Sequence, residues 1–140
     1  MAEREHIPAY VQQHGPPSAA VRLTHLRDEL AELEREPAWA HADRLARTLT
    51  KQGPLRMVLV RLRAGARLAE HDAGGPVTIH CVMGNVRVLC AGQAFSLAQG
   101  DILTLDDALK HSVEAHDDAA LLLTIARSQG GEPLSAIGAQ

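Results

Sequence analysis

Three histidines stand in strand-like segments of this chain and could bring their side chains together: His71, His80 and His111. Neutral imidazoles bind zinc, iron, nickel or copper, and three of them around one ion leave an open position for water or substrate. Near neutral pH an imidazole also serves as a general acid or base, or orients a carboxylate, enol or phenol. These residue types therefore suit either a metal site or a histidine-anchored pocket for a small organic molecule.

The elements that must position these histidines are strands. From residue 44 onward, short runs rich in Leu and Val alternate with polar residues and are separated by Gly, Asn or Asp, a period typical of β-structure. We expect strands at 44–50, 55–63, 67–71, 77–83, 86–90, 93–97, 102–105, 111–116 and 119–126. Strands at this spacing, without helices between them, indicate a mainly β sandwich, barrel or jelly roll.

A helix precedes the strands. Four leucines at spacings of three and four residues define one face of a helix expected over about 18–35, namely Leu23, Leu26, Leu30 and Leu33. Ser18 is the expected N-cap, and Pro37 lies beyond the helix end. Charged residues on the opposite face, among them Arg22 and Glu29, are expected in solvent.

Length and composition limit the classes of function. A chain of 140 residues with 46 % hydrophobic and 22 % charged residues is expected to form one domain. We divide it into residues 1–52 with the helix and a leading strand, a barrel over 53–126, and a C-terminal tail over 127–140. Because aromatic residues are only 2 % and the net charge is −3, the chain lacks the stacking rings and basic field of a nucleic-acid binder.

No apolar run approaches the roughly 18 residues that cross a membrane, so we expect no membrane partner and a cytoplasmic location. The two cysteines, Cys81 and Cys90, do not form a Cys-x-x-Cys pair and are expected as reduced, buried thiols.

The strand region resembles the cupin family, whose fold is the double-stranded β-helix. Gly65 precedes His71 at the spacing of the first cupin motif, and Gly84 closes that motif. In the second motif Gly92 opens a hairpin, the Gly-Asp turn begins at Gly100, and His111 follows it. The chain also resembles a group of small uncharacterised bacterial cupins, which have an N-terminal helix before the barrel. This resemblance implies a cupin jelly roll and no particular reaction.

The chain departs from the cupin motifs at the remaining ligand positions. Ala73 stands where the second histidine belongs, and Val77 where the glutamate belongs. The proline before the Gly-Asp turn is Ala98, and the final asparagine is Ala115. Of the metal-ligand positions that the resemblance implies, only those of His71 and His111 have a residue that can bind a metal. Water or an exogenous molecule would have to complete the coordination of any divalent metal held by these two.

Strand alternation divides the other candidates. If Val77 points into the barrel, Ile79 and Cys81 do so as well, and His80 points out, unless a bulge near 74–78 reverses the faces. His80 is therefore a third metal ligand only with such a bulge. The expected pocket is small and apolar with two polar anchors, and its residues are His71, Ala73, Val77, Ile79, Cys81, His111 and Val113.

Three functions fit this pattern. In the first, which we favour because motif residues are missing, the barrel binds a small molecule, with or without a divalent metal, through His71 and His111. The second is a metal-dependent enzyme of the dioxygenase or isomerase type. The third is a structural or interaction module that acts as a dimer. A homodimer is compatible with all three, because an antiparallel sheet with exposed edges is often covered by a second copy.

Overall fold

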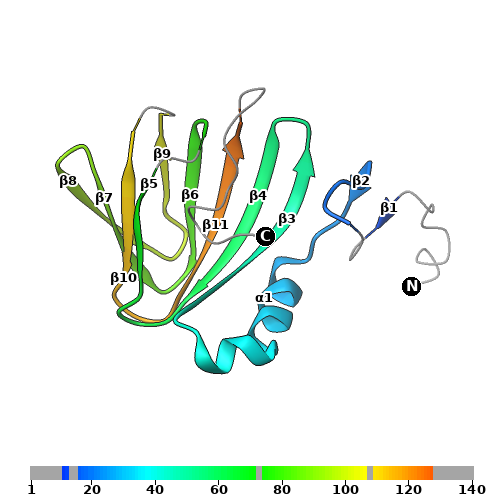
Figure 1. The fold of residues 1–140 in the computed structure, drawn as a ribbon, viewed down its shortest axis with the longest axis horizontal. Helices are drawn as coiled ribbons and strands as arrows, with labels where there is room; N and C mark the ends of the chain where they lie inside the picture. Colours follow the sequence, from blue (N-terminus) through cyan, green and yellow to red (C-terminus); the bar gives the residue numbers. More distant parts are fainter. Residues whose placement is uncertain (1–10, 13–15, 72–73, 107–108, 128–140) are drawn as a thin grey trace.

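The computed structural model describes residues 11–12, 16–71, 74–106 and 109–127. Two antiparallel sheets form a jelly-roll barrel, and one helix lies against the larger sheet (Figure 1). The larger sheet has the order β3 (Arg44–Gln52), β4 (Leu55–Leu62), β11 (Ala119–Ala126), β6 (Val77–Met83) and β9 (Ile102–Leu105). The smaller has the order β5 (Arg67–His71), β10 (His111–Ala115), β7 (Asn85–Cys90) and β8 (Gln93–Ala98). The expected strands are all present, within two residues at each end.

Aliphatic side chains from both sheets fill the barrel interior. Along β11, Leu121, Leu123 and Ile125 are buried in this interior cluster, whereas Leu122 packs in a second cluster beneath the helix. Such alternation follows from the strand period of two. Each buried aliphatic side chain contributes about 1.5–3 kcal/mol, so this interior is the main source of stability. Cys81 and Cys90 belong to it as free, buried thiols, as expected.

The two turns that the motifs predicted are built around glycines. Gly84, between β6 and β7, has a φ of 79°, and a Cβ there would lie 2.3 Å from the carbonyl oxygen of Asp118. Gly100 has a φ of 94° and is the third residue of the turn from Ala98 to Asp101 that leads into β9. The carboxylate of Asp101 then accepts a hydrogen bond from the backbone N–H of Ala98 at 2.9 Å. A left-handed backbone and a close approach both favour glycine, so the motif spacing has a steric cause.

The helix is shorter than the leucine spacing predicted. It is α1 (Leu26–Glu34), so the expected start near residue 18 was wrong. His25 is the N-cap residue, and its side chain makes no capping hydrogen bond. Ser18 therefore does not cap the helix.

Contacts with the sheet hold the segment before α1 in an extended form. Residues Val21–Arg22 form β2, which pairs in parallel with β1 (Val11–Gln12). The backbone N–H of Lys51, on β3, donates to the carbonyl of Pro17 at 2.9 Å. The guanidinium of Arg22 donates to the carbonyl of Leu49, also on β3, at 2.7 Å. These hydrogen bonds join the segment before α1 to β3. If the helix began near residue 18, this segment could not make them.

The leucine stripe continues only within α1. Leu26, Leu30 and Leu33 pack on the outer face of the larger sheet, against a cluster that includes Leu49, Leu59 and Leu122. Leu23, outside the helix, is 46 % exposed. The predicted solvated face was wrong at Glu29, which is 1 % exposed, and at Arg22, whose side chain is 7 % exposed. The Glu29 carboxylate meets the guanidinium groups of Arg22 at 3.4 Å and Arg47 at 3.1 Å, because the helix lies over β3.

A short 3-10 segment, η2 (Pro37–His41), joins α1 to β3 and buries Trp39. The guanidinium carbon of Arg63 lies 4.0 Å from the centre of the indole ring, and that of Arg61 lies 5.2 Å from it. These cation–π contacts hold the segment against the barrel. Within the described part of the chain, no helix is long and apolar enough to cross a membrane.

Candidate functional site

Among the described residues, His111 is a polar side chain that is buried at one end of the barrel. It begins β10 and is 3 % exposed, although it is a titratable group. Its Nδ1 lies 3.5 Å from the carbonyl oxygen of Leu109. The next inward residue, Val113, belongs to the aliphatic interior. A buried imidazole among aliphatic side chains requires hydrogen-bond partners, so its position is chemically distinct from the rest of the core.

A register shift decides which residue stands beside His111. In the β5–β10 ladder His111 pairs with His71, whereas Val113 pairs with Leu68. Three residues of β5 therefore span two of β10, which is a β-bulge. Without this extra residue, Glu70 would stand opposite His111. The bulge thus brings the backbones of the two predicted histidines together on neighbouring strands, at roughly 5 Å between Cα atoms.

The remaining predicted pocket residues are distributed along the barrel. Val77, Ile79, Cys81 and Val113 are all buried in the interior cluster. Ala73 lies outside the described residues, and the His71 side chain is also outside that description. Val77 pairs with Leu105, whose strand precedes the loop into His111, so Val77 belongs to the His111 end.

Cys81 lies toward the other end of the barrel. Its Sγ donates toward the carbonyl oxygens of Gly84 at 3.3 Å and Met83 at 3.5 Å. Gly84 leads directly into Asn85, the first residue of β7, whereas His111 stands opposite Cys90, the last. Five residue steps along a strand separate these ends by about 16 Å. The structure therefore does not bring Cys81 together with His111.

The environment of Cys81 also keeps its thiol protonated. Burial raises the pKa of Cys81 above its ordinary value, and the carboxylates of Asp101 and Asp117 raise it further. A thiol is a nucleophile or metal ligand as the thiolate. This cysteine is accordingly a core side chain whose S–H donates to backbone carbonyls.

His80 lies on the opposite face of β6 from Val77, Ile79 and Cys81. It is half-buried, and it pairs with Leu122 of β11 and Ile102 of β9. The irregularity in the β6–β11 ladder falls beyond Cys81, toward Met83, so it leaves the alternation over 77–81 intact. The bulge that would have turned His80 inward is absent from this part of β6, and His80 does not join His111.

Sequence reasoning did not assign to the site three residues at the His111 end of the barrel. Cys90 pairs with His111 directly on β7 and is 5 % exposed. Leu105 and Leu109 flank the connection that leads into β10, and both pack with the interior cluster. All three lie at or near the ends of strands at the His111 end of the barrel. This shared position can be recognised only when the order of the strands is known.

Among the described residues, no group of three or more His, Cys, Asp or Glu side chains could hold a metal ion. Beside the imidazole of His111, the β7 partner Cys90 contributes a buried thiol, and aliphatic side chains of the interior cluster lie nearby. A stable site for a divalent transition metal normally has three or four protein ligands. The described donors therefore do not by themselves make up a metal site, and no chemistry is derived through a metal.

Comparisons with known proteins identify the fold. No family model matches the sequence, and no curated protein is significantly similar to it. A cupin-superfamily protein from Desulfitobacterium hafniense is 15 % identical, with a TM-score of 0.59 over 61 % of this chain and 78 % of that chain. A cupin-2 domain containing protein from Shewanella frigidimarina is 12 % identical, with a TM-score of 0.60 over 75 % and 95 %.

A variant of salicylate 1,2-dioxygenase from Pseudoaminobacter salicylatoxidans has a TM-score of 0.69 at 16 % identity. This match covers 81 % of our chain but only 37 % of the dioxygenase. A second structure of that variant contains gentisate. At such identities the likeness concerns the fold alone.

Proposed function

We propose that this chain, which has the cupin fold, binds a small organic molecule inside its barrel, with His111 and His71 as polar anchors. The observation that carries the proposal is the 3 % exposed imidazole of His111 at one end of an interior that consists, among the described residues, mainly of aliphatic side chains. Ligand pockets commonly combine an apolar lining with a few polar groups that set orientation. We propose His71 as the second such group, because its backbone pairs with that of His111 on the neighbouring strand.

The chemistry of the anchors defines the ligand class. A neutral imidazole offers one donor and one acceptor, so it can bind a hydroxyl or a carboxyl group. The aliphatic side chains near His111, including Val77, Leu105 and Val113, suit a flat hydrocarbon body. We therefore propose a small phenolic or enolic carboxylate as the ligand. The dioxygenase of the same fold has been crystallised with gentisate, a compound of this kind.

Calorimetric titration of the tag-free protein with salicylate, gentisate and benzoate tests the proposal. We expect saturable binding of at least one compound, lost in His111→Ala and retained in His80→Ala, since His80 lies on the other face of β6. Absence of saturable binding by all three at millimolar concentration would overturn this ligand class. Equal affinities in the two variants would show that His111 is not an anchor.

The metal content of the same preparation tests the enzyme alternative. The ligand proposed above needs no metal, because the two imidazoles would bind it directly. We therefore expect mass spectrometry of chelator-free protein to find no stoichiometric metal. Near-stoichiometric metal that disappears in the His71→Ala, His111→Ala double variant would instead support a metal-dependent cupin enzyme. Sedimentation of the same sample tests the proposed homodimer.

A further inference from the structure

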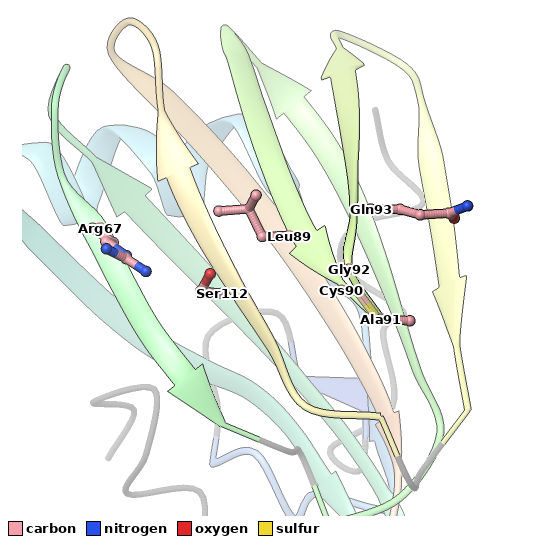
Figure 2. A pocket seen from close by; sticks show the side chains of 7 residues that line it. All are labelled: Arg67, Leu89, Cys90, Ala91, Gly92, Gln93 and Ser112. Atoms are coloured by element: carbon pink, nitrogen blue, oxygen red, sulfur yellow. The ribbon is translucent and has the colours of Figure 1, made fainter.

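A cavity lies on the outside of the smaller sheet, at the β7–β8 turn. It has a volume of about 340 Å³ and is lined by Arg67, Leu89, Cys90, Ala91, Gly92, Gln93 and Ser112 (Figure 2). Cavities of roughly 300–1,000 Å³ are typical of small-molecule sites. This one is at the small end of that range, so it has room for a small ligand.

The floor of the cavity comes from three neighbouring strands. Ser112 of β10 pairs with Leu89 of β7, and Arg67 projects from β5 on the other side of β10 (Figure 2). Ser112 lies between His111 and Val113, whose side chains belong to the opposite face. Because serine is short, it leaves a hollow between the longer side chains of Arg67 and Leu89. The residue is nevertheless only 4 % exposed.

The charges on this face leave Arg67 available to a ligand. Its Nε lies 3.9 Å from the carboxylate of Glu114, and the two side chains are 61 % and 36 % exposed. An ion pair this long and this exposed contributes little. Glu114 also stands opposite Arg87 of β7 in the ladder. Two arginines therefore flank one glutamate in the ladder, and these three residues together carry one net positive charge.

We propose that this outer cavity binds a small aliphatic carboxylate. The guanidinium of Arg67 donates to the carboxylate oxygens, the hydroxyl of Ser112 donates a further hydrogen bond, and Leu89 contacts the hydrocarbon chain. A planar guanidinium matches carboxylate geometry, and charge-assisted hydrogen bonds are the stronger kind. The site lies on the other side of the sheet from His111, so it stands independently of the function proposed for the barrel interior.

A titration of isotope-labelled protein with sodium propionate, followed by amide resonances, tests this site. Sodium chloride at matched ionic strength is the reference. We expect saturable shifts centred on Ala91, Gly92 and Ser112. Loss of the Arg67 hydrogen bonds in Arg67→Gln should weaken binding about tenfold or more. Ser112→Ala should weaken it a few-fold without a change of charge.

Arg87→Gln is the matched control, because Arg87 lies on the same strand as Leu89 but does not line the cavity. We expect its affinity to equal that of the parent. Equal weakening in Arg67→Gln and Arg87→Gln would indicate general attraction of anions and would overturn the site, as would the absence of saturable shifts. The His111→Ala variant should bind propionate unchanged; a loss there would show that the ligand enters the barrel instead.

Discussion

Replacing Glu29 by glutamine should lower the free energy of unfolding by about 3 kcal/mol, because it removes one partner of a buried ion pair. The carboxylate is 2 % exposed and lies between the Arg22 guanidinium, itself 7 % exposed, and that of Arg47. Both arginines come from segments that α1 covers. The variant leaves these cations without their central counter-charge, at the contact between α1 and the sheet.

The size of the destabilisation depends on which ion pairs and hydrogen bonds Arg22 and Arg47 still make in the variant. Breaking a buried pair by removing one partner costs about 3–5 kcal/mol. Arg47 keeps its ion pairs with Glu32 at 3.0 Å and with Glu36. Arg22 keeps its hydrogen bond to the Leu49 carbonyl at 2.7 Å. These remaining contacts place the expected loss at the lower end of the range.

Glu32→Gln is the matched control, since Glu32 is 39 % exposed and pairs with the same Arg47. Its loss should be at most about 1 kcal/mol. Urea unfolding followed by the fluorescence of Trp39, which is 8 % exposed, measures both variants. With a slope of about 1.5 kcal/mol per molar urea, Glu29→Gln should lower the midpoint by about 2 M. Equal losses in the two variants would refute the reasoning.

Two further predictions concern the turns. Ala91 has a φ of 54° beside Gly92 in the two-residue β7–β8 turn. Because asparagine adopts this left-handed conformation more readily than alanine, Ala91→Asn should stabilise the protein by up to about 1 kcal/mol. A lower melting temperature of the variant would contradict backbone strain at Ala91. Hydrogen bonds from the side-chain amide and backbone N–H of Asn85 hold the pKa of Asp117 below its ordinary value. A carboxyl group whose pKa is lower in the folded than in the unfolded protein stabilises the fold at pH values above its unfolded-state pKa, which is about 3.9 for Asp. This stabilisation is lost as the pH falls through the folded-state pKa. Asp117→Asn should thus be less stable than the parent at pH 7 and equal to it in strong acid; a urea-midpoint difference that does not change with pH would contradict this.

Much of the barrel could be predicted from the sequence. The strand bounds, the two motif turns and the outward position of His80 all follow from a period of two and from glycines at turns. The helix start could not be predicted so well, because the carbonyls of Pro17 and Leu49 take part in hydrogen bonds between the N-terminal segment and β3. The burial of Glu29 was hidden for the same reason, since its cationic partners come from distant segments.

The sequence by itself determined which side chains share a face of each strand, because alternation is a local property of an extended backbone. It thereby separated His80 from Val77, Ile79 and Cys81. Only the tertiary structure decided that His71, and not Glu70, stands opposite His111, because the bulge depends on how β5 pairs with β10. The outer cavity has the same origin: its residues come from separate strands, and their proximity follows from sheet order, which no local pattern encodes.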